Sequence, residues 1–171
     1  MDKASRKTKR GREAASTKPS AWVLSFVVIY AALQLLMPLR HLLYKRELVW
    51  THEGVNYGWR MMADHHESKW GLTIEDPATK KVYSVSPEKT LNYKQLTMMG
   101  HSPYLLFQYV QFLKRVTTRQ TGIANPVIKA DVEVSVNGRP YQYMFDRSSD
   151  LSTVTYSPFK EESWILPFKE Q

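Results

Sequence analysis

A run of 21 residues without a charged side chain, Pro19–Leu39, constrains this chain more than any other feature of its sequence. Ten of the 21 residues are Leu, Ile, Val or Phe, and Ser25 and Gln34 are the clearly polar side chains in the interior. As a helix the run would be about 31 Å long, which matches a bilayer hydrocarbon core of about 30 Å. Trp22 at one end, with basic and aromatic residues after the other, is typical of membrane-interface anchors. We therefore predict one transmembrane helix over residues 21–43.

Two other interpretations fit this run less well. A buried helix of a soluble domain seldom continues so long without a charge. A cleaved signal peptide needs a shorter apolar core followed by small residues, and the sequence from Leu35 to Leu39 offers no such cleavage pattern. Pro38 should bend or end the helix about one turn before its exit.

The charges around the run predict its orientation. Residues 1–20 carry seven basic and two acidic side chains and no apolar periodicity, so we expect a disordered cytoplasmic tail. A basic tail can bind nucleic acid, but a membrane span directly beside it argues against a nucleic-acid partner. Four basic residues follow within about 20 residues of the run, and the modest excess before it favours a cytoplasmic N-terminus. Residues 47–171 would then lie in the lumen or periplasm.

Residues 47–171 predict a β-rich α+β domain with an antiparallel sheet and about two packed helices. From Ile128 to Val136, apolar residues alternate with polar ones, as in a strand with one wet face. Asn137–Gly138 is a typical two-residue hairpin turn. If the turn pairs Val136 with Arg139, the following aromatic residues share the face of the valines: Tyr141, Tyr143 and Phe145.

Other elements follow from caps and turns. Ser102–Pro103 predicts the start of a long helix and Gly122 its end, and Ser86–Pro87 predicts a shorter helix that continues to Gly100. Segments 70–75 and 81–86 resemble a hairpin across the turn at residues 76–79, and 57–63 is a plausible first strand.

The sequence contains no obvious catalytic constellation. It has no cysteine, which excludes disulfides, thiol nucleophiles and thiolate metal sites. His65 and His66 are adjacent and would diverge on a strand or a helix, and the other histidines are far apart in the sequence. We therefore expect no catalytic, cofactor-binding or metal-binding residue in this chain. As candidate interface residues we select aromatic and arginine side chains, which dominate binding hot spots: Trp59, Arg60, Trp70 and Trp164.

Six motifs in the same order resemble one family. They are YGWRMM at Tyr57–Met62; Asp76–Pro77 with its Thr-Lys turn; the spaced set Leu91, Gln95, Met98, Pro103 and Gln108–Tyr109; Ser135–Asp146; Asp150–Leu151; and Ser157–Pro167. Together they resemble the last membrane helix and lumenal domain of vitamin K-dependent gamma-carboxylases and of their microbial relatives, which share the horizontally transferred transmembrane (HTTM) domain. The resemblance covers about residues 20–171.

The resemblance implies an enzyme that couples oxidation of reduced vitamin K to carboxylation of glutamate, with CO₂ and O₂ as co-substrates. The catalytic lysine and histidine of the family belong to an earlier membrane bundle, and no position here matches them. We therefore expect the chain to be inactive alone, with reduced vitamin K bound only through that bundle. The implied partners are the membrane, a multi-helix HTTM-type protein and a glutamate-containing polypeptide substrate.

Two interpretations of function follow from these observations. In the first, the chain is the non-catalytic part of a split or truncated carboxylase-like enzyme. In the second, it is an independent single-pass membrane protein that presents an interaction domain.

Overall fold

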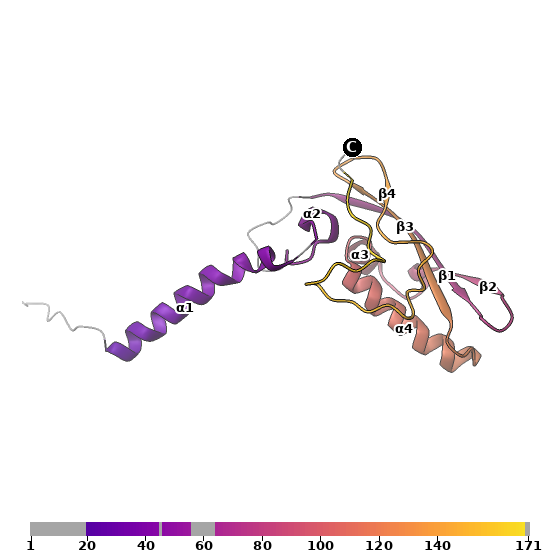
Figure 1. Cartoon of the computed structure of the whole chain (residues 1–171), viewed down its shortest axis with the longest axis horizontal. Helices are drawn as coiled ribbons and strands as arrows, with labels where there is room; N and C mark the ends of the chain where they lie inside the picture. The colour runs from indigo at the N-terminus through magenta and orange to yellow at the C-terminus, as the bar shows by residue number, and fades with distance from the viewer. Residues whose placement is uncertain (1–19, 45, 56–63, 170–171) are drawn as a thin grey trace, which may run out of the picture. The chain divides into compact units, whose positions relative to one another are not determined.

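The computed structural model describes residues 20–44, 46–55 and 64–169, and its elements are labelled in Figure 1. The predicted first strand at 57–63 lies outside these residues. Contacts divide the chain into two compact units, residues 1–35 and 36–171.

The apolar run forms helix α1 (Ala21–Leu39), followed by a short 3-10 helix, η1 (Arg40–Leu43). With a mean hydropathy of 2.0, α1 is long and apolar enough to cross a membrane. None of its residues is buried by protein, and Trp22 is 80% exposed. A helix apolar on every side requires an apolar surrounding, which a bilayer would supply.

Four antiparallel strands form one sheet in the order β2-β1-β3-β4, as the predicted α+β fold requires. Their bounds are β1 His66–Glu75, β2 Val82–Val85, β3 Val127–Val136 and β4 Gln142–Tyr143. The central strands pair along ten positions, from His66 opposite Val136 to Glu75 opposite Val127. The predicted hairpin between β1 and β2 is confirmed, and its turn is closed by hydrogen bonds to the Asp76 carboxylate.

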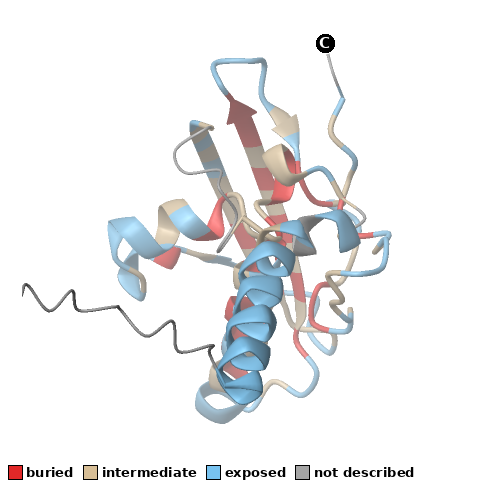
Figure 2. Ribbon diagram, turned by 90° about the vertical axis from the view of Figure 1, so that its left-hand side faces the viewer, coloured by how far each residue is buried: buried red, intermediate tan, exposed pale blue. Residues whose placement is uncertain are grey.

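One face of the sheet is buried and the other is wet. Every second residue of β3 is at most 1% exposed, and this alternation is visible along the strand in Figure 2. These residues are Ile128, Ala130, Val132, Val134 and Val136. On the opposite face charged side chains pair across strands, such as Lys69 with Glu133 at 3.9 Å. The alternation predicted from the sequence is therefore confirmed.

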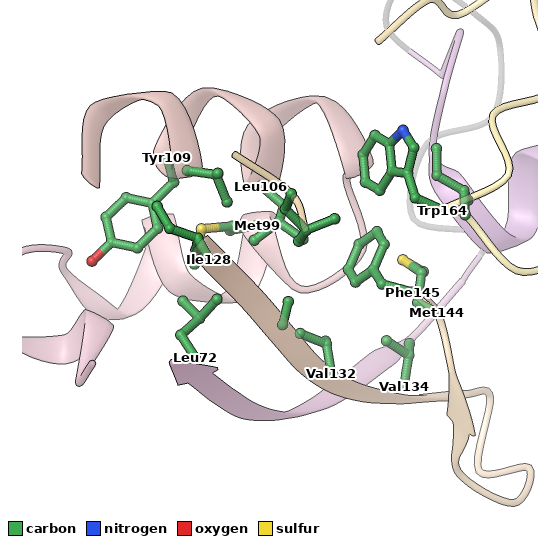
Figure 3. Packing of buried hydrophobic residues seen from close by; sticks show 14 of the residues in the cluster. Leu72, Met99, Leu106, Tyr109, Ile128, Val132, Val134, Met144, Phe145 and Trp164 are labelled. Atoms are coloured by element: carbon green, nitrogen blue, oxygen red, sulfur yellow. The ribbon is translucent and has the colours of Figure 1, made fainter. Parts of the chain in front are cut away.

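Helices α3 (Tyr93–Met99) and α4 (Pro103–Thr121) pack on the apolar face (Figures 1 and 3). Ser102 caps α4 through Leu105 N–H, and Gly122 ends it with a φ of +72°, as predicted. The shorter helix forms in two pieces, because Asn92 makes a capping box with Gln95 and starts α3 after the separate turn η2 (Pro87–Lys89).

In the β3–β4 hairpin the observed register differs from the predicted one by one residue. Asn137 and Gly138 have positive φ and Arg139 N–H bonds to Val136 O, as the turn requires. Beyond it, however, Val134 pairs with Gln142 instead of Tyr141. Pro140 has no N–H to give, so the ladder is interrupted and resumes with one extra residue, as in a bulge. Tyr141 and Tyr143 consequently lie on the wet face, whereas Phe145 is buried as predicted.

The short helix α2 (Leu48–Thr51) and the C-terminal segment add side chains to the same hydrophobic core, among them Trp50 and Trp164. Trp50 is 2% exposed and donates to Leu166 O at 2.8 Å. Arg46 binds both carboxylate oxygens of Glu53, at 2.7 and 2.8 Å, and Tyr156 donates to the same carboxylate. These contacts hold residues 46–53 against the sheet domain.

Val132→Ala tests whether β3 carries the core. Val132 is fully buried, so losing two methyl groups should lower the free energy of unfolding by about 1.5–3 kcal/mol. The matched change Val82→Ala, at a residue 60% exposed on edge strand β2, should cost less than about 1 kcal/mol. Denaturant unfolding of the full chain in detergent, followed by tryptophan fluorescence, measures both. Equal losses would contradict this assignment of the core.

Candidate functional site

Three histidines from separate elements meet beside the start of β1. His52 follows α2 with a left-handed backbone, at a φ of 52°. His66 is the first residue of β1, and its pairing with Val136 places it on the helix-covered face of the sheet. His101 lies in the short connection between α3 and α4.

A glycine allows the third histidine to approach. Gly100 lies so close to Ser68 that a Cβ at position 100 would overlap the Ser68 side chain. Ser68 is two residues from His66 on the same face of β1. The close approach at Gly100 therefore brings His101 over the beginning of the strand.

The three rings are in mutual contact. The ring centroid of His52 lies 4.3 Å from that of His66 and 4.3 Å from that of His101. The centroids of His66 and His101 are 5.0 Å apart. One ring nitrogen from each histidine lies within 4.8 Å of the others. This arrangement of three imidazoles could hold a metal ion.

Hydrogen bonding in the cluster is incomplete. His66 Nε2 bonds to Val49 O at 2.8 Å. His52 Nε2 and His101 Nδ1 are buried and have no hydrogen-bond partner in the described part of the chain. Asp64 Oδ2 lies 3.9 Å from His52 Nε2, which is too long for a hydrogen bond.

The rings favour the neutral state. Burial lowers the pKa of His52 to about 4 and that of His101 to about 3, and the neighbouring histidines add to both shifts. Burial also lowers the pKa of His66, partly opposed by its bond to Val49 and by Asp64. Neutral imidazole is the form that binds metal ions.

A pocket of about 590 Å³ adjoins the three rings. Besides the histidines it is lined by residues of β1 and α3 and by two acidic side chains, Asp64 and Glu67. Trp70 and Tyr93 add aromatic surface to it. The cluster is therefore accessible to small molecules from one side.

The predicted interface residues fall in different places. Trp59 and Arg60 lie outside the described residues. Trp70 is half-buried, donates to Ser68 Oγ at 3.1 Å and lines the pocket beside the histidines. Trp164 is 2% exposed and stacks on Phe145 inside the core (Figure 3), so its side chain is packed within the domain.

The histidine cluster was missed by the sequence analysis, which predicted no metal-binding residue. That prediction considered only neighbours in the sequence, and the three residues are separated by 14 and 35 positions. The adjacent pair did not help, because His65 points to the wet face and is 75% exposed. The register between β1 and β3 could have placed His66 near the helices, because it sets His66 opposite Val136 on the apolar face of the sheet.

Comparison with known proteins identifies the family. A family model described as "Vitamin K-dependent gamma-carboxylase, lumenal domain" matches residues 19–171. The chain belongs to this family. The match confirms the resemblance seen in the six sequence motifs, and it includes both α1 and the sheet domain. No solved structure matches the chain significantly.

The low pKa values of the histidines predict destabilisation by mild acid. As pH falls from 7 to 5, histidines of the unfolded chain take up protons near pH 6.5, whereas His52 and His101 resist protonation in the folded state. The unfolded chain then binds more protons, so the free energy of unfolding should fall over this range. Asp64, beside His52, opposes the effect without cancelling it.

Denaturant unfolding at several pH values, in buffer containing a chelator, measures this slope. His101→Gln should make the slope shallower, and the matched change His65→Gln, which leaves the three clustered rings intact, should keep it. An unchanged slope in His101→Gln would show that the cluster does not carry the effect.

Proposed function

We propose that this chain is the membrane-anchored lumenal domain of a carboxylase-like enzyme and takes no part in the chemical step itself. The observation that carries the proposal is a family match that joins α1 to the entire sheet domain. Among the described residues, α1 is the one helix long and apolar enough to cross a membrane. A multi-helix catalytic bundle would have to be supplied from outside these residues, and it would bind reduced vitamin K.

In this proposal the sheet domain positions a glutamate-containing polypeptide or covers the mouth of the bundle. Two surfaces support a binding role. One is the pocket beside the histidines, with Trp70 in its wall. The other is an apolar groove of about 440 Å³ between α3 and α4. Its lining includes Met98, Leu105 and Phe112, and Phe112 is 40% exposed, so it offers apolar surface to a partner.

A second function has a separate observation in its favour. Residues 36–171 form a compact unit whose core is filled by its own side chains. Such a domain needs no membrane bundle to bury its apolar face. It could act as an interaction module on an independent single-pass anchor.

Reconstitution distinguishes these two functions. The full chain is co-expressed with a multi-helix HTTM-type protein, solubilised in detergent and captured. We expect the two proteins to copurify, and we expect vitamin K-dependent glutamate carboxylation that neither protein shows alone. A chain whose Ala21–Leu39 is replaced by an unrelated apolar span of equal length serves as control, and it should stay in the membrane but associate more weakly. A partner-free monomer that restores no activity would favour the independent module.

The absence of cysteine permits a direct test of orientation. Single cysteines are introduced in the basic tail, Ser5→Cys, and at an exposed position of α4, Thr118→Cys. In sealed vesicles with the cytoplasmic face outward, a membrane-impermeant maleimide should label only Ser5→Cys, because seven basic residues precede α1 and only four follow within about 20 residues of it. Both should react after detergent is added. Labelling of Thr118→Cys alone in sealed vesicles would reverse the proposed orientation.

A further inference from the structure

The clustered histidines present a set of donor atoms that suits one metal ion. One nitrogen from each of His52, His66 and His101 lies within 4.8 Å of the other two. Tetrahedral zinc, with Zn–N bonds of about 2.0–2.1 Å, holds its ligand nitrogens roughly 3.3 Å apart. The three donor atoms would have to approach one another by about 1.5 Å at most to reach that spacing.

Two buried nitrogens in the cluster are an independent sign of a missing ligand. His52 Nε2 and His101 Nδ1 have no hydrogen-bond partner among the described residues. A buried polar atom without a partner costs roughly 1–3 kcal/mol, and most such atoms in folded proteins are paired. Both nitrogens belong to the same three-ring cluster. A single cation between the rings would bind both of them.

The hydrogen bond of the third ring fixes its tautomer. A carbonyl oxygen can only accept, so His66 Nε2 must carry the proton that it donates to Val49 O at 2.8 Å. In the neutral ring this leaves the lone pair on Nδ1. Histidine ligands commonly donate their second N–H to a backbone carbonyl in this way, which fixes the orientation of the ring.

We propose that His52, His66 and His101 bind one zinc ion, with Asp64 as the neighbouring carboxylate. Imidazole donors without thiolates suit zinc, and three protein ligands leave a fourth position for Asp64 or for a molecule from the pocket. Asp64 Oδ2 lies 3.9 Å from His52 Nε2 and lines the same pocket. The ion would link α2, β1 and the α3–α4 connection. This site is independent of the carboxylase assignment, because it depends only on contacts within the sheet domain.

Zinc titration of the chelator-stripped full chain tests the site. The protein is purified in detergent with an affinity tag that contains no histidine, and zinc chloride binding is measured by calorimetry. We expect one ion per chain. His52→Ala and His101→Ala should each weaken binding by about 100-fold or more, since loss of a supporting hydrogen bond alone costs 10–100-fold. The matched variant His65→Ala, at the exposed neighbouring histidine, should bind as the unmodified chain does.

Thermal unfolding keeps the test decisive if an alanine variant does not fold. Zinc bound only by the folded state should raise the Tm of the unmodified chain and of His65→Ala. Absence of saturable binding, or of a Tm increase on adding zinc, would overturn the proposal. Equal loss of binding in His65→Ala would also overturn it, since the ion would then be held at the surface.

Discussion

The pairing of β1 with β3 over ten residues is the constraint on which the rest of the sheet domain depends. It joins residues 66–75 to 127–136, so the chain between them, which includes α3 and α4, must return across the sheet. The alternation in β3 selects the covered face. A slip of one residue would turn Asp131 and Glu133 into the core and expose Val132 and Val134. Each large apolar side chain so exposed would lose about 1.5–3 kcal/mol of burial.

The same register determines where the histidines meet. Opposite Val136, His66 must face the helices, whereas a shift by one residue would bring His65 there instead. Gly100 then permits the α3–α4 connection to contact β1 beside Ser68. The cluster is thus a consequence of sheet register and of one close backbone approach, and no short motif encodes it.

Sequence reasoning succeeded where the determinant is local. Caps at Ser102 and Gly122 and the turn at Asn137–Gly138 depend on the conformational preferences of one or two residues, and the structure has all three. The register after the turn was wrong by one residue, because two local signals compete there: the hairpin turn favours direct pairing, whereas Pro140 interrupts it. The histidine cluster was missed because its members share no local pattern. It requires the tertiary fold.

The polar groups around α2 show why the unpaired nitrogens are informative. Glu53 is 6% exposed, and its carboxylate is bound by both Arg46 and Tyr156. Next to it in the sequence, the buried Nε2 of His52 has no partner among the described residues. The second such nitrogen in the described part of the chain belongs to His101, whose ring contacts that of His52. Imperfect packing would scatter such defects through the domain. Their coincidence in one ring cluster, beside a fully satisfied carboxylate, favours a single shared ligand for both nitrogens.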